Sequence, residues 1–117
     1  MKLSDIARKL DASVLSGGDR LELDITRCGA SDLMSDILAG LADGSLLLTG
    51  LATLQTVRTA SIAGVGAIVL VRGKTPPQEV LELAAAQGLP LISTPVSMFV
   101  ACGRLHACGL TGLNGNR

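Results

Sequence analysis

The fold of this chain is most clearly predicted from the stretch Ala67-Ile68-Val69-Leu70-Val71-Arg72-Gly73-Lys74. Its apolar run has no polar alternation, which predicts a strand buried on both faces, as in parallel sheets. Two similar runs flank it in the sequence, Leu46-Leu47-Leu48-Thr49-Gly50 and Leu89-Pro90-Leu91-Ile92-Ser93-Thr94. Helical patterns separate the three runs, and right-handed crossovers through those helices would bring all three strand ends to one edge of the sheet.

Apolar spacings of three and four predict helices around these strands. We expect helices over residues 5–10, 31–41, 54–63, 75–86 and 96–108, with Ser4 and Thr75 as N-caps. The N-terminal third differs, because residues 12–15 and the alternating segment 21–26 predict two shorter strands at a sheet edge. We therefore predict a single α/β domain over residues 1–110, with a mostly parallel central sheet of about five strands and helices on its faces. Residues 111–117 are expected to be a flexible tail.

The composition narrows the class of protein. The chain has 117 residues, a formal net charge of +0 and 1% aromatic residues, which argues against nucleic acid as a partner. No apolar stretch approaches the ~20 residues of a membrane span, and the N-terminus does not resemble a signal peptide. The odd number of cysteines, Cys28, Cys102 and Cys108, fits reduced thiols in the cytoplasm better than a disulfide framework.

The predicted strand ends carry the candidate ligand site. Open α/β sheets bind ligands at the edge where the strands end. Two cations and a glycine follow the central strand, and small or hydroxylated residues follow its neighbours, so that the candidate ligand-binding residues are Thr49, Gly50, Arg72, Gly73, Lys74, Ser93 and Thr94. Such a set would bind phosphate or carboxylate. The alternative is that the cations are solubilising loop charges.

Catalytic and metal chemistry find less support. No segment matches the phosphate loop G-x-x-x-x-G-K-[ST], and no G-x-G-x-x-G follows a strand. Cys102 and His106 share a helix face, but with Cys108 and the distant Cys28 they lack the spacing typical of a zinc site. One histidine does not define a nucleophile set. We expect no metal, no cofactor and no catalysis.

The last predicted helix is apolar around most of its girth, with few polar residues between 96 and 108. One side should lie on the sheet, and a second subunit would cover the other. We therefore expect a homodimer that uses this helix, because so small a domain hides little apolar surface. The alternative is a deeply buried helix in a monomer.

The segment from Leu46 to Leu110 resembles the DRTGG domain and, more remotely, the N-terminal domain of HPr kinase/phosphorylase. The resemblance rests on Leu47-Leu48-Thr49-Gly50, Ala67-Ile68-Val69-Leu70-Val71-Arg72-Gly73, Pro76-Pro77-Gln78-Glu79-Val80-Leu81-Glu82-Leu83-Ala84 and Gly88-Leu89-Pro90-Leu91-Ile92-Ser93-Thr94. The chain departs from the family wording where Arg72-Gly73-Lys74 stands in place of a Thr-Gly-Gly.

The resemblance implies a regulatory role, because family members are attached to CBS domains and to metabolic enzymes such as phosphotransacetylase. Stand-alone copies accompany iron-hydrogenase and redox genes of anaerobes. It implies no kinase activity, since the catalytic phosphate loop of HPr kinase lies in a domain that this chain lacks. The leading hypothesis is a non-catalytic domain that senses a small anionic metabolite or nucleotide. The alternatives are a protein-interaction adaptor for a larger metabolic or hydrogenase complex, with no small ligand, and a phosphotransfer enzyme, which the missing phosphate loop disfavours.

Overall fold

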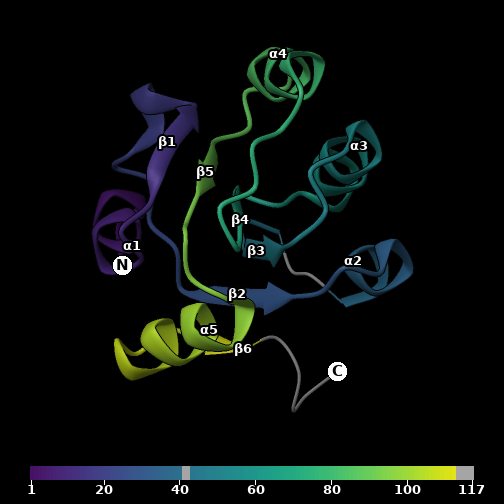
Figure 1. The fold of residues 1–117 in the computed structure, drawn as a ribbon. Coiled ribbons are helices and arrows are strands. Elements are labelled where there is room, and N and C mark those ends of the chain that lie inside the picture. Colours follow the sequence, from purple (N-terminus) through teal and green to yellow (C-terminus); the bar gives the residue numbers. More distant parts are fainter. Residues whose placement is uncertain (41–42, 113–117) are drawn as a thin grey trace.

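The computed structural model describes residues 1–40 and 43–112. Its centre is a six-stranded sheet with the strand order β1-β5-β4-β3-β2-β6 (Figure 1). The strands are β1 (Ser13–Ser16), β2 (Arg27–Ala30), β3 (Leu46–Thr49), β4 (Ala67–Leu70), β5 (Leu91–Ser93) and β6 (Thr111–Gly112). Every neighbouring pair is parallel except β1 with β5, which is antiparallel. The predicted fold class is confirmed.

In the described parts of the chain, five α-helices cover the two faces of the sheet. They are α1 (Leu3–Lys9), α2 (Met34–Gly40), α3 (Leu54–Ala63), α4 (Gln78–Ala86) and α5 (Met98–Ala107), and a short 3-10 turn spans Gly18–Arg20. Helices α2, α3 and α4 lie on one face, and α1 and α5 lie on the other (Figure 1). Two apolar cores result, one on each side of the sheet.

The strand β3 shows why its sequence lacks alternation. Leu46 and Leu48 face the core that contains α1 and α5, whereas Leu47 faces the core that contains α2 and α3. All four residues of the strand are buried. A strand between two covered faces needs apolar side chains in both directions, so the continuous run in the sequence was a sound signal.

The alternating segment 21–26 is not a strand, and this prediction is wrong. The carbonyl oxygens of Leu21 and Leu23 accept hydrogen bonds from the first backbone N–H groups of α1, those of Ser4 and Leu3, at 2.9 Å each. The first N–H groups of a helix have no partner within the helix. Here the segment accepts hydrogen bonds from these N–H groups and does not pair with a neighbouring strand. The strand next to β3 is β2, which lies inside the sheet between β3 and β6 rather than at an edge.

Four helix starts also differ from the sequence prediction, and one of them is that of α2, which was expected from residue 31 and begins at Met34. Helix α1 begins one residue before Ser4, and α4 begins at Gln78, so neither Ser4 nor Thr75 is an N-cap. Thr75 precedes two prolines, and a residue before proline is disfavoured in the helical conformation. Helix α5 begins at Met98, because the Ser97 side chain caps it by accepting from the N–H of Val100.

The last described residues lie in the segment that was expected to be a flexible tail. Thr111 and Gly112, placed in the predicted tail, form β6 beside β2, and residues 113–117 lie outside the described residues. Within the described ranges, no helix is long and apolar enough to cross a membrane.

Candidate functional site

The carboxyl ends of β2 to β5 meet at one edge of the sheet, as their parallel registers require. After β4 the chain turns through two consecutive left-handed residues, Arg72 with φ of 62° and Gly73 with φ of 66°. Backbone hydrogen bonds of 2.8 Å fasten this turn, from the N–H of Arg72 to the oxygen of Val96 and from the N–H of Gly73 to the oxygen of Thr94. A left-handed arginine is uncommon. The turn leaves the side chains of Arg72 and Lys74 exposed.

Asp32 lies at the same edge, directly after β2, and was missed by the sequence analysis. Its Oδ1 accepts a hydrogen bond of 2.7 Å from the N–H of Gly50 and one of 2.8 Å from Oγ1 of Thr49. The Gly50 hydrogen bond is the main reason that the pKa of Asp32 lies below its usual value. Burial opposes this shift, while the Thr49 hydroxyl and the charges of Arg72 and Lys74 reinforce it.

Gly50 holds open the space between Asp32 and Arg72. A β-carbon at position 50 would lie 3.2 Å from Nη2 of Arg72 and 3.5 Å from Oδ2 of Asp32. The guanidinium and the carboxylate thus approach the same point. Yet in residues 1–40 and 43–112 neither Arg72 nor Lys74 has an ion-pair partner within 4.0 Å. Within the described residues, the edge therefore presents two cations that form no ion pair, beside a carboxylate that accepts its hydrogen bonds from neutral donors.

Two predicted hydroxyl donors are used inside the fold. Oγ of Ser93 donates to the backbone oxygen of Lys74 at 2.9 Å. Thr94 is fully buried, and its hydroxyl donates to the backbone oxygen of Leu10. Ser93 therefore fixes the loop after β4, and Thr94 fixes the segment after β5 to the end of α1.

A cavity of about 370 Å³ opens beside this loop. Of the seven predicted site residues, Gly73, Lys74 and Ser93 line it, together with Asp11, Ser13, Leu15, Thr75 and Pro95. The start of β1 reaches this place because β1 runs antiparallel to β5. Thr49, Gly50 and Arg72 gather a short way along the edge, around Asp32.

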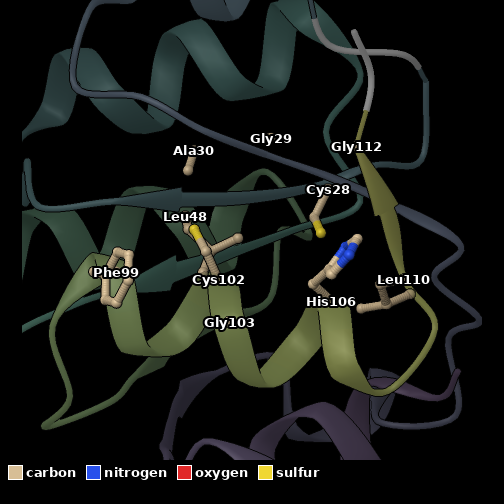
Figure 2. A pocket seen from close by; sticks show the side chains of 10 residues that line it. All are labelled: Cys28, Gly29, Ala30, Leu48, Phe99, Cys102, Gly103, His106, Leu110 and Gly112. Atoms are coloured by element: carbon tan, nitrogen blue, oxygen red, sulfur yellow. The ribbon is translucent and has the colours of Figure 1, made fainter. Parts of the chain in front are cut away.

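A second, apolar cavity of about 410 Å³ lies between the sheet and α5 (Figure 2). Cys28 of β2 points toward α5, which contributes Phe99, Cys102, Gly103 and His106 (Figure 2). The fold thus joins Cys28 to the Cys102 and His106 pair, although the sequence separates them widely. Among the described residues, no group of three or more histidine, cysteine or carboxylate side chains could hold a metal ion.

The thiols in this apolar cavity are poor nucleophiles. All three cysteines are free. Burial raises the pKa of the Cys28 thiol to about 11, with a smaller contribution from Cys102. Burial also raises the pKa of Cys102. Since the thiolate is the reactive form, both side chains behave as apolar lining at neutral pH.

Comparisons with known proteins agree with this architecture. The DRTGG domain family model matches residues 5–108. A crystal structure from Clostridium perfringens has a TM-score of 0.73 at 18% sequence identity, and the match covers 89% of this chain and 45% of that chain. That structure contains the CBS and DRTGG domains of the regulatory region of a pyrophosphatase, complexed with its activator diadenosine tetraphosphate. The chain thus spans under half of that protein chain, and the likeness shows the fold. A search of curated proteins gives no match.

Proposed function

This chain belongs to the DRTGG domain family, and on that basis we propose that it is a non-catalytic regulatory domain that senses a small anionic metabolite or nucleotide. The proposed site is the sheet edge around Gly50 and Arg72, together with the adjoining cavity at Lys74. The pyrophosphatase region of similar fold is complexed with a nucleotide activator, which makes adenine nucleotides the first ligands to test.

One observation carries the proposal. A buried backbone N–H and a buried hydroxyl, those of Gly50 and Thr49, converge on a single carboxylate oxygen. Donors that converge on one point are the arrangement by which proteins hold an anionic oxygen. The two cations, which have no ion-pair partner in the part of the chain that the structure describes, stand beside that point, so the same edge has the charge and the donors that a phosphate group needs.

In the proposed complex, Arg72 and Lys74 supply the positive charge, while Gly50 and Gly73 allow close approach of the ligand. The hydroxyl of Thr49 donates a hydrogen bond. Ser93 and Thr94 belong to the site through their hydrogen bonds to the surrounding backbone. The cavity of about 370 Å³ gives room for the rest of a small ligand, since ligand sites of about 300–1,000 Å³ are usual.

Thermal unfolding with a ligand panel tests this function. The panel contains ATP, ADP, diadenosine tetraphosphate, pyrophosphate and acetate. A ligand at a hundred times its dissociation constant adds about 2.7 kcal/mol of stability, which raises the melting temperature of a domain this size by on the order of 10 °C. A flat panel in a folded sample would reject the sensing function.

A second candidate is an adaptor that binds protein and no small ligand, and the surface of α5 favours it. Phe99, the sole aromatic residue, is 89% exposed, and the neighbouring Val100 is 39% exposed. We propose that the protein bound at this surface is a second copy of the chain, so that the adaptor is itself a cytoplasmic homodimer. The adaptor would serve a metabolic or hydrogenase complex. Light scattering that gives a monomer at tens of micromolar would rule out the homodimer, and a Phe99→Ser variant that stays dimeric would rule out this helix as its interface.

A further inference from the structure

We propose that Asp32 is an internal competitor for the anion position at the sheet edge, so that a ligand must displace its carboxylate to bind. The inference rests on the proposed function, because it concerns the regulation of that same site. It makes Asp32 a residue that sets which anions the site accepts.

The geometry carries the first step. Oδ1 of Asp32 takes both convergent donors, the N–H of Gly50 at 2.7 Å and the hydroxyl of Thr49 at 2.8 Å. Thr49 and Gly50 are buried, whereas Asp32 belongs to an exposed segment between β2 and α2. The donors are therefore fixed in place, and the acceptor is the part that can leave toward water.

Replacement of the carboxylate by a ligand oxygen preserves the hydrogen bonding of the edge. Buried donors without an acceptor are costly, so the site favours some anionic oxygen at this point at all times. In the free protein Asp32 supplies it. A phosphate group would supply the same oxygen and could also reach Arg72 and Lys74, which Asp32 does not pair with.

Charge decides which ligands win this competition. While Asp32 holds the position, its negative charge repels an incoming anion and partly neutralises the two cations. A ligand with a single negative charge gains little over the carboxylate it displaces. A di- or triphosphate carries several charges and engages both cations after Asp32 has moved into water, so Asp32 selects for multiply charged oxyanions.

Population arithmetic gives the size of the effect. Apparent affinity falls by the fraction of molecules in which the site is free. If the carboxylate occupies the position in more than about nine-tenths of the molecules, the wild-type affinity is at least about tenfold below that of a site without it.

Isothermal titration with pyrophosphate on the full chain tests the proposal. Asp32→Asn keeps the side-chain shape and removes the charge, and Asp32→Ala removes the acceptor. Asp19→Asn is the matched control, because Asp19 lies in the turn Gly18–Arg20, far from Asp32. This turn follows Gly17, which lies close to Pro90 at the opposite edge of the sheet. The control substitution removes the same charge at a distance. We expect Asp32→Ala, which empties the position, to bind pyrophosphate at least tenfold more tightly than the wild type. Asp32→Asn, which keeps a neutral acceptor there, should gain less, and Asp19→Asn should bind within twofold of the wild type.

Stability supplies a second readout that does not depend on a wild-type affinity. Asp32→Ala should have a lower melting temperature than the wild type, since it leaves the Gly50 and Thr49 donors unpaired. Pyrophosphate should raise the melting temperature of Asp32→Ala more than that of the wild type.

The outcomes separate this inference from the function it rests on. If the wild type binds pyrophosphate and Asp32→Ala binds it equally or more weakly, the anion site stands and the competitor role is wrong. Weaker binding would mean that the carboxylate itself contacts the ligand. If neither the wild type nor either Asp32 variant binds pyrophosphate, the anion site and the competitor role both fail.

Discussion

Replacement of Arg72 by alanine should remove most of the anion affinity and leave the stability of the domain almost unchanged. Arg72 is exposed and, within the described residues, has no ion-pair partner. Its loss should therefore change the free energy of unfolding by no more than about 0.5 kcal/mol, as at other surface positions. A charge-assisted hydrogen bond to a ligand contributes about 1.5–3 kcal/mol. Because about 1.4 kcal/mol is a factor of ten, the dissociation constant should rise roughly 10- to 150-fold.

A matched substitution separates the charge of Arg72 from its backbone. Arg72 has a φ of 62°, a conformation that costs a non-glycine residue roughly 1–2 kcal/mol and glycine almost nothing. Arg72→Gly should thus lose the same affinity as Arg72→Ala while it stabilises the domain by about 1 kcal/mol. Equal stabilities of the two variants would contradict the strained backbone at this position.

The assay is isothermal titration of each variant with pyrophosphate, next to urea unfolding of the same samples. Arg58→Ala is the control, because Arg58 is an exposed residue of α3. It should bind like the wild type. If Arg72→Ala and Lys74→Ala also bind like the wild type, the reasoning about the sheet edge is refuted, and the apolar cavity beside α5 becomes the next site to test.

Gly17→Ala should destabilise the domain by roughly 2 kcal/mol or more in urea unfolding, because Gly17 has a φ of 81° and a β-carbon there would lie 2.6 Å from Cα of Pro90. Acid should lower the free energy of unfolding of the wild type more than that of Asp32→Asn, because the folded-state pKa of Asp32 is lowered. The stability that this carboxylate contributes is complete above the usual pKa of about 3.9, and it is lost as the pH falls from that value through the lower folded-state pKa. Equal acid sensitivity of the two proteins in urea unfolding between pH 6 and pH 3 would contradict this. At pH 7 iodoacetamide should alkylate the exposed Cys108 before Cys28, whose pKa is raised to about 11, as mass spectrometry of timed samples can show.

Buried strands were the part of the fold that the sequence could predict well. The runs at β3 and β4 are apolar at every position because both faces of the sheet are covered, and this requirement is visible in the residues themselves. The helix α3 was also predicted with its observed bounds, and in the structure Thr53 caps its start and Gly64, with a φ of 79°, ends it. Local chemistry of this kind needs no knowledge of distant residues.

The segment 21–26 shows where local patterns fail. Its alternation of apolar and polar residues is real, since Leu23 packs on the core and Ile25 is buried in it. What the segment pairs with, however, is the N-terminus of α1. Hydrogen-bond partners of the backbone are not encoded in the side-chain pattern of one segment, so the prediction chose a strand where the chain had another partner.

The composition and the order of apolar runs determined the class of this protein, the parallel core and the edge at which its cations gather. Which residues meet at that edge depends on how the strands are arranged in the folded sheet. Asp32 reaches Gly50 across 18 positions of sequence, because β2 lies next to β3, and Cys28 reaches the cavity beside α5 for the same reason. The apolar runs of the strands can be predicted because their side chains must be buried. Which strands lie next to one another depends on how the backbone hydrogen bonds of the whole chain are satisfied. A site between neighbouring strands therefore forms only when the complete sheet has formed.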